Sequence, residues 1–476
     1  MDMWNYNTRT QFRFTLLITI LFFLLFESSC KKFIEVDAPI TSVNTGNVYN
    51  ENSNAIAVLT GLYAKMSDSR FSLNLSVYPD LSADNLSLYD QNTISKLFYQ
   101  NALKSNSSIP FWGDLYSYVY ITNAAIEGLT KSTSLSPIVK QRLLGESYFM
   151  RGFYYFYLLN LYGEVPLILS TDYLINSRLQ KQQMNIIYEQ IIDDLNRAKS
   201  LMDNNYVDGT VVKESIERVR PNGLAASALL SRVYLYMKKY SLAESEATKV
   251  INQSDLYSLV ELNSVFLKHS REVIWSLQPV SSSIITNEGS FYIYSNAGPD
   301  GLSNTFLSDN FLQSFESGDE RKINWIGEKA IGNKTYSYPF KYKIKSGDAA
   351  AATEYTVVLR LAEQYLIRAE ARVEQNNFID AKMDLNAIRR RAGLIETSAS
   401  GLQELRAAIS KERRSELFTE WGNRWFDLKR TGNIDAVMQS ISLMKGGIWL
   451  PFKSLFPLPL YDIQRNPNLT QNSGYQ

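Results

Sequence analysis

The pattern of apolar and polar positions along the chain predicts long amphipathic helices. From Pro137 the segment PIVKQRLLGESYFMRGFYYFYLLNLYG places apolar residues three or four positions apart, and Gly163 marks its end. A second segment, MNIIYEQIIDDLNRAKSLM, begins at Met184 and carries Ile187 and Ile191 on one apolar stripe. This spacing is typical of helices that bury one face, and it differs from the alternation of a strand.

Two segments far apart in the chain share one arrangement. ALLSRVYLYMKKYSLAESEATKVI and LIRAEARVEQNNFIDAKMDLNAI each predict a helix, a short polar break and a second helix. The second helix opens on an aromatic residue followed three positions later by alanine: Tyr240 with Ala243, and Phe378 with Ala381. In tetratricopeptide repeats the ring fills the bend of a helical hairpin and the alanine lets its helices approach. We therefore expect such hairpins over roughly 111–255 and 355–431.

Two stretches of the chain lack a sustained helical period. Residues 44–110 and 279–352 are rich in Ser, Asn, Asp, Gly and Tyr, and long loops inside a compact domain are usually functional. We predict a mainly α fold in which tetratricopeptide-like hairpins form a platform. The two stretches are expected to pack on it as a loop-rich irregular layer with a few short strands, all within one domain over 30–476.

Residues 1–29 have the features of an export signal. The segment FTLLITILFFLLF follows a positively charged start and is too short for a stable membrane anchor. Two serines then precede Cys30, the only cysteine in the chain. A signal that ends on cysteine resembles the lipobox of bacterial lipoproteins, in which that cysteine becomes the lipidated first residue. The alternative is a retained membrane anchor, because Glu27 stands where a lipobox usually has an apolar residue.

Charge and residue counts exclude several classes of function. Lys and Arg total 49 while Asp and Glu total 48, and a net charge of +1 offers nothing that attracts nucleic acid. One cysteine and one histidine, His269, cannot build a Cys/His metal site, and we expect no metal or cofactor. Tyrosine is abundant at 30 residues, and its ring with a polar tip suits cores and binding surfaces alike.

Catalysis would need residues that this chain does not single out. A glycosidase requires two facing carboxylates, and nothing in the sequence selects a pair among four candidates: Asp80, Asp84, Glu416 and Glu420. Glu416 and Glu420 lie one helical turn apart, which favours a salt-bridged helix face among Arg413, Arg414 and Arg424. A Ser-His-Asp hydrolase would rest on His269 alone. We predict no enzymatic activity.

Six blocks of sequence, spread in order from Cys30 to Gln476, carry a family resemblance. They are SCKKFIEVDAP, ESYFMRGFYYFYLLNLYGEVPL, RPNGLAASALLSRVYLYMKKYSLAESEA, LRLAEQYLIRAEARVEQNNFIDAKMDLNAIRRRAGL, ISKERRSELFTEWGNRWFDLKRTG and LFPLPLYDIQRNPNLTQNSGYQ. Together they resemble the SusD/RagB family of outer-membrane lipoproteins from Bacteroidetes-type bacteria. Because six blocks occur in the right order and the resemblance extends over essentially the whole chain after the export signal, it is specific.

The resemblance implies a receptor without catalytic activity. Members of the family are lipid-anchored on the outer membrane, pair with a TonB-dependent transporter of the SusC type and capture oligosaccharides, or in some members peptides, for import. Their ligand contacts vary, so only the lipidated Cys30 carries over to this sequence. The alternative function is a tetratricopeptide-type scaffold of the cell envelope without a small ligand of its own, because such hairpins usually bind other proteins.

Candidate ligand-binding residues come from the loop-rich stretches. The segment SSSIITNEGSFYIYSNAGPDGLSNTF has flexible flanks that favour outward-facing rings at Tyr292 and Tyr294, although alternation would also make SFYIYS a short strand. Both versions keep the two tyrosines together, where they suit a sugar ring or a peptide. Tyr78 and Tyr89 flank the segment PDLSADNLSL, and Trp325 lies in the second stretch. We predict these five residues as the ligand site.

Overall fold

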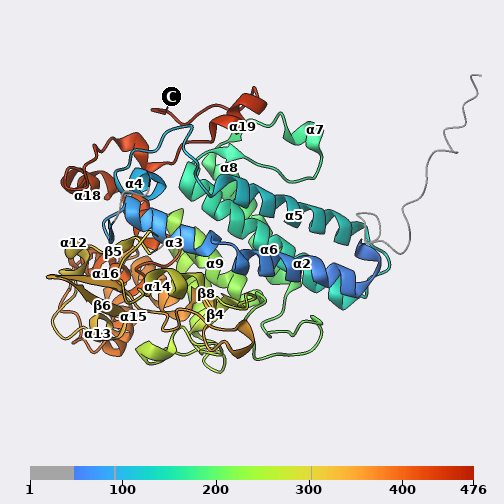
Figure 1. Ribbon diagram of the computed structural model, residues 1–476. Coiled ribbons are helices and arrows are strands. Elements are labelled where there is room, and N and C mark those ends of the chain that lie inside the picture. The colour runs from blue at the N-terminus through green and yellow to red at the C-terminus, as the bar shows by residue number, and fades with distance from the viewer. Residues whose placement is uncertain (1–47, 90–92, 302, 476) are drawn as a thin grey trace, which may run out of the picture. The chain divides into compact units, whose positions relative to one another are not determined.

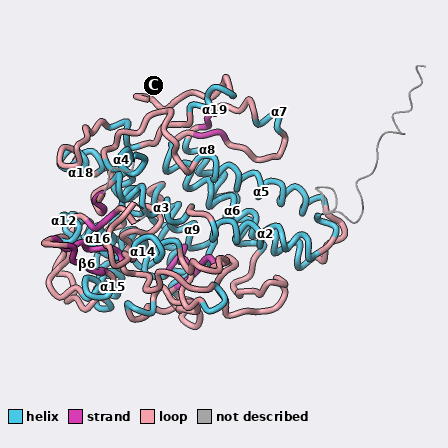
Figure 2. The backbone as a smooth tube through the Cα atoms, viewed as in Figure 1, coloured by secondary structure: helices cyan, strands magenta, loops and turns pink. Residues whose placement is uncertain are grey.

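The computed structural model describes residues 48–89, 93–301 and 303–475, and most of this part of the chain is helical (Figures 1 and 2). The longer helices are α2 (Asn52–Asp68), α3 (Phe71–Ser82), α5 (Trp112–Lys131), α6 (Pro137–Tyr162), α8 (Met184–Leu201), α9 (Gly223–Tyr236), α10 (Tyr240–Ile251), α14 (Leu361–Glu374), α15 (Phe378–Arg391) and α16 (Leu402–Glu416). The shorter ones are α4 (Thr93–Tyr99), α7 (Tyr173–Asn176), α11 (Asn287–Tyr292), α12 (Asp309–Leu312), α13 (Glu320–Asn324), α17 (Asn423–Arg430), α18 (Ile434–Ile441) and α19 (Leu460–Arg465). The predicted mainly α fold is confirmed.

The strands form small antiparallel pairs, as the prediction of a few short strands requires. The pairs are β1 (Leu86–Leu88) with β5 (Thr305–Leu307), β2 (Val165–Pro166) with β3 (Lys181–Gln182), β4 (Val273–Leu277) with β8 (Thr356–Arg360), and β6 (Ile326–Ile331) with β7 (Lys334–Pro339). Segments distant in sequence meet in two of them, because β1 pairs with β5 and β4 with β8. The pair β6–β7 is a local hairpin.

Helix α6 forms the centre of the core, and its ends lie where the sequence predicts them. Pro137 occupies the first helical position, where its missing N–H costs nothing, and Gly163 ends the helix at a φ of +76°. Tyr154, Tyr155 and Tyr157 are fully buried on this helix. The abundance of tyrosine therefore serves the core in large part.

The helices of the platform pack in series. Helix α5 packs on α6, α6 on α8, α8 on α9, α9 on α10, α10 on α14 and α14 on α15. Buried ion pairs join helices of this series: Arg151 on α6 contacts Asp194 on α8 at 2.7 Å, and Arg232 on α9 contacts Glu363 on α14, two helices further along, at 2.6 Å. Hairpins separated by more than a hundred residues of sequence thus stack directly on each other.

The hairpins α9–α10 and α14–α15 share the predicted tetratricopeptide-like geometry. Lys238 and Asn376 both adopt left-handed backbone, with φ of +58° and +61°, and each lies two residues before the aromatic that opens the second helix. Ala243 and Ala381 have no exposed surface. The two turns are therefore built alike, and both alanines lie at close helix contacts.

The expectation of loops over 44–110 is wrong, because α2, α3 and α4 occupy much of this stretch. In α2 the buried residues Ala55, Leu59, Leu62 and Met66 recur every three or four positions and form a helical stripe. Because polar residues occupy the other face of α2, the composition of the stretch does not reveal this stripe. The stretch 279–352 is more irregular and contains only short helices and strands.

Cys30 and the export signal lie outside the described residues, so their role stays a prediction. Within 48–475, apart from the two short gaps, no helix combines the length and the hydropathy that a membrane span requires.

Candidate functional site

The tyrosine pair of the second loop-rich stretch is buried, contrary to expectation. Tyr292 ends α11, is 3% exposed and lines a cavity of about 10 Å³, which has room for a water molecule and not for a sugar. Tyr294 is 8% exposed, and its hydroxyl donates to the carbonyl oxygen of Thr305 at 2.6 Å. The flanking segments therefore do not hold these rings outward, and SFYIYS is not a strand because α11 covers its first half.

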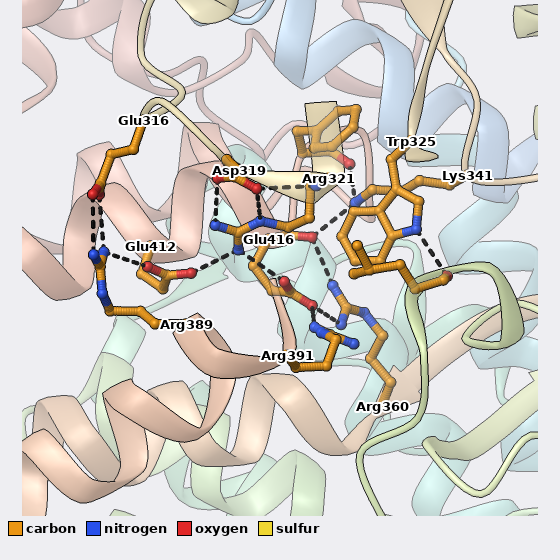
Figure 3. A network of polar contacts seen from close by, with 12 residues as sticks. Glu316, Asp319, Arg321, Trp325, Lys341, Arg360, Arg389, Arg391, Glu412 and Glu416 are labelled. Atoms are coloured by element: carbon orange, nitrogen blue, oxygen red, sulfur yellow. Dashed lines mark hydrogen bonds and ion pairs between the residues drawn. The ribbon is translucent and has the colours of Figure 1, made fainter. Parts of the chain in front are cut away.

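Trp325 is also fully buried, within a network of charged side chains (Figure 3). Its indole N–H donates to the carbonyl oxygen of Leu262 at 2.9 Å, and the ammonium of Lys341 lies 4.8 Å from the ring centroid. A ring enclosed in this way has no free face for a ligand. Trp325 belongs to the interior of the loop-rich layer.

Glu416 is the centre of this network and has no exposed surface. Its carboxylate contacts Arg321 at 3.0 Å, Arg360 at 2.6 Å and Arg391 (Figure 3). Burial alone would raise the pKa of Glu416, but the guanidinium groups of Arg391, Arg360 and Arg321 outweigh it and hold the pKa well below its usual value. Glu420 extends the network by pairing with Arg360 and Lys341.

The predicted partners of Glu416 and Glu420 are wrong. Arg413 pairs with Asp427, and Arg414 and Arg424 both pair with Asp84. The two glutamates are buried and do not form a solvated helix face, because arginines from distant segments reach them.

The four carboxylates considered for catalysis are all buried and all engaged. Asp80 accepts hydrogen bonds from the backbone N–H of Thr419 and from Asn85, and burial raises its pKa to about 6. Asp84 lies in ion pairs, and Glu416 and Glu420 lie in the network. These groups do not form the open carboxylate pair on which a glycosidase depends.

Tyr78 and Tyr89 differ in their surroundings. Tyr78 lies on α3, not in a loop, and stacks on Phe98 with ring centroids 4.4 Å apart. Tyr89 directly follows β1 and is 43% exposed. Its ring packs edge-on against Tyr336 at 5.4 Å. Of the five predicted residues, Tyr89 is the one that the structure leaves at the surface.

Tyr89 is part of a partly exposed aromatic patch, which we define as Tyr89, Phe306, Tyr336 and Tyr338. Phe306 on β5 packs edge-on against Tyr336 on β7 at 5.3 Å, so rings from two strands and from the residue after β1 gather at one place. The ring of Tyr338 packs at a tilt of 53° against the buried Tyr294, with the ring centroids 4.6 Å apart. Tyr294, which was predicted to contact the ligand, therefore packs against the inner side of the patch.

The β6–β7 hairpin positions two rings of the aromatic patch. Its register places Lys329 opposite Tyr336 and Gly327 opposite Tyr338, so these four residues share one face of the pair. The Tyr338 ring lies across Gly327, where an added Cβ would come within 2.3 Å of the ring. Burial raises the pKa of the Tyr338 hydroxyl, which stays neutral at physiological pH and can donate or accept hydrogen bonds.

A second surface feature is a groove beside α19. It consists of two adjoining cavities of about 440 and about 490 Å³ that share Ser105, Asn106 and Leu460. Its exposed ring is Tyr461, which stacks against Arg465 at 3.9 Å. The groove has the volume of a ligand site, but it presents fewer rings than the aromatic patch.

Sequence reasoning missed Phe306, Tyr336 and Tyr338. The segment KTYSYP held a usable signal, because tyrosines two positions apart on a strand point to the same face. Phe306 has no comparable local signal. It reaches the patch only because β5 pairs with β1 and lies near β7.

Comparisons with known proteins agree on one family. The family profile described as "SusD family" matches residues 282–475, and that described as "Starch-binding associating with outer membrane" matches 32–235. A SusD-like protein of Formosa agariphila is 23% identical over 96% of this chain and 99% of its own length. A crystal structure of a SusD superfamily protein from Bacteroides vulgatus superposes with a TM-score of 0.77 at 20% identity, covering 90% of this chain and 100% of that one. A laminarin-binding SusD-like protein superposes with a TM-score of 0.71 at 22% identity, covering 89% and 99%.

Proposed function

This chain belongs to the SusD family, and on that premise we propose that it captures oligosaccharides at the outer membrane and delivers them to a transporter. The ligand surface is the aromatic patch. A sugar ring presents C–H faces that pack on aromatic rings and hydroxyls that hydrogen-bond to polar neighbours. The similarity to a laminarin-binding protein and to a starch-binding family supports a glycan as the ligand.

The observation that carries the proposal is the difference in solvent exposure between the patch and the other rings that were predicted to bind the ligand. Tyr292, Tyr294 and Trp325 are buried, whereas Tyr89 is 43% exposed. The structure also brings Tyr89 to Tyr336 from a segment almost 250 residues away. Rings that several segments hold together at the surface are pre-organised for a ligand.

Calorimetric titration of the full chain in detergent tests this proposal. A panel of oligosaccharides, with a peptide panel beside it, identifies the ligand, and Tyr89→Ala and Tyr336→Ala should each lower its affinity about tenfold or more. Tyr120→Ala is the matched control, because Tyr120 is exposed on α5 and lies outside the patch. If Tyr461→Ala removed binding while both patch variants kept it, the ligand would belong in the groove beside α19.

A SusC-like TonB-dependent transporter is the proposed partner. Helix α7 presents three consecutive apolar side chains to solvent: Tyr173, Leu174 and Ile175 are 78%, 72% and 57% exposed. Exposed apolar clusters of this kind mark protein interaction surfaces. Leu174→Glu should reduce co-purification with the transporter and leave glycan affinity unchanged.

The proposed location is the outer face of the outer membrane, with Cys30 as the lipid attachment site. Acyl chains on this residue would hold the protein at the membrane, and two or more chains anchor durably. The scaffold alternative differs in one measurable property. A receptor binds its oligosaccharide without the transporter, and a scaffold does not.

A further inference from the structure

The face of the β6–β7 hairpin that carries the tyrosines of the aromatic patch also carries two lysines. Lys329 lies opposite Tyr336 and Lys334 lies opposite Ile331, so both share the face of Tyr336 and Tyr338. Their ammonium groups therefore lie beside the rings that we assign to the ligand.

Lys334 is held against the aromatic patch by its rings. Its Nζ lies 4.8 Å from the centroid of Tyr336 and 5.1 Å from that of Phe306, which is the range of a cation–π interaction. Lys329 donates to the side-chain oxygen of Asn296 at 3.4 Å. Among the described residues, neither ammonium forms an ion pair with a carboxylate.

The described acidic residues around the hairpin do not neutralise these cations. Glu328 lies opposite Ser337, on the other face of the hairpin. Asp300 accepts the backbone N–H of Ser303 at 2.8 Å within its own turn. The helical platform is different, because arginines there pair directly with buried carboxylates, as Arg232 does with Glu363. Within the described part of the chain, two ammonium groups without a carboxylate partner thus lie beside the stacking faces of the aromatic patch.

We propose that the ligand of this site is an acidic oligosaccharide, whose uronate carboxylates or sulfate groups bind Lys334 and Lys329 while its sugar rings pack on the aromatic patch. This inference rests on the proposed glycan-binding function and adds the class of glycan. An ammonium already seated on two rings has lost side-chain freedom, so pairing with an anion costs little additional entropy. A neutral glucan would use the rings and leave both cations unused.

Titration of the full chain in detergent with oligosaccharides of equal length tests this inference. The probes are hexagalacturonate and a sulfated carrageenan hexasaccharide as the acidic arms, and maltohexaose and laminarihexaose as the neutral arms. We expect at least one acidic probe to bind about tenfold or more tightly than both neutral probes. Its affinity should fall as salt rises from about 50 to 500 mM, because exposed charge pairs are screened.

Lys334→Gln should weaken the acidic probe about fivefold or more and leave any neutral binding unchanged. The matched control is Lys213→Gln, which removes an exposed lysine outside the patch. The inference is overturned if a neutral probe binds as tightly as the acidic ones, or if Lys334→Gln has no effect on them. The inference is also overturned if an acidic peptide binds and the acidic oligosaccharides do not. If no glycan binds at all, the proposed function itself fails.

Discussion

Replacing Glu416 by glutamine tests whether the buried charge network stabilises the fold. Glutamine keeps the shape of the side chain and removes its charge, which leaves Arg321, Arg360 and Arg391 with one carboxylate fewer between them. Breaking a buried ion pair by neutralising one partner costs about 3–5 kcal/mol, because a charge then remains buried without compensation. With three guanidinium groups around a side chain that has no exposed surface, we expect the loss to lie in this range.

The matched control for this variant is Glu396→Gln. Glu396 pairs with Arg390 at 2.8 Å, but their side chains are 63% and 59% exposed. An exposed pair of this kind contributes at most about 1 kcal/mol. Both variants exchange the same chemical groups, so a difference between them reports the burial of Glu416 together with its three guanidinium partners.

Urea unfolding monitored by tryptophan fluorescence provides the assay, because Trp325 lies inside the network. The midpoint at pH 7 should fall by about 1 M or more for Glu416→Gln and much less for Glu396→Gln. The folded-state pKa of Glu416 lies below that of the unfolded chain. Its contribution is therefore complete above about pH 4.5 and is lost as pH falls through the folded-state pKa. Equal midpoints for the two variants at pH 7 would refute this reasoning, as would a difference that does not narrow in acid.

Three further predictions concern the hairpins, the anchor and a buried acid. Ala243→Phe and Ala381→Phe should each lower stability by roughly 1–3 kcal/mol through overpacking, and melting temperatures equal to that of exposed Ile379→Phe would contradict the hairpin contacts. Cys30→Ser should move the protein from the membrane fraction to the soluble fraction, and full retention on membranes would argue against lipidation. The Asp80 pKa of about 6 exceeds its ordinary value of 3.8, so the contribution of Asp80 to wild-type stability should fall as pH rises between these values. Asp80→Asn should reduce this fall when urea midpoints are measured across that pH range. An unchanged dependence of the midpoint on pH would contradict the assignment of the fall to Asp80.

Local pattern was sufficient to predict the platform. The ends of α6 follow from Pro137 and Gly163, and each hairpin follows from an aromatic residue and an alanine three positions apart. These signals are local, because helix ends and helical turns depend on residues only a few positions away. The same reasoning missed α2, whose apolar stripe lies among serines, asparagines and a threonine.

The candidate site depends on contacts that local pattern does not encode. Trp325 is buried because its N–H reaches Leu262, 63 residues away, and Tyr89 is exposed beside Tyr336 from a distant strand. From composition alone, both Trp325 and Tyr89 were expected to contact a ligand from a loop-rich stretch. The partners of Glu416 were likewise wrong because Arg321 and Arg360 precede it by 95 and 56 residues.

The network and the aromatic patch are connected through the β6–β7 hairpin. Arg321 lies shortly before β6 and Lys341 shortly after β7, and these two residues bind Glu416 and Glu420. A two-stranded hairpin is marginally stable alone, so its position depends on how its ends are held. Glu416→Gln should therefore weaken glycan binding at the aromatic patch under conditions where the protein remains folded, although Glu416 is buried and is not one of the ligand contacts. Glu396→Gln should leave glycan affinity unchanged. If folded Glu416→Gln bound the glycan with wild-type affinity, the hairpin would hold its position without the network.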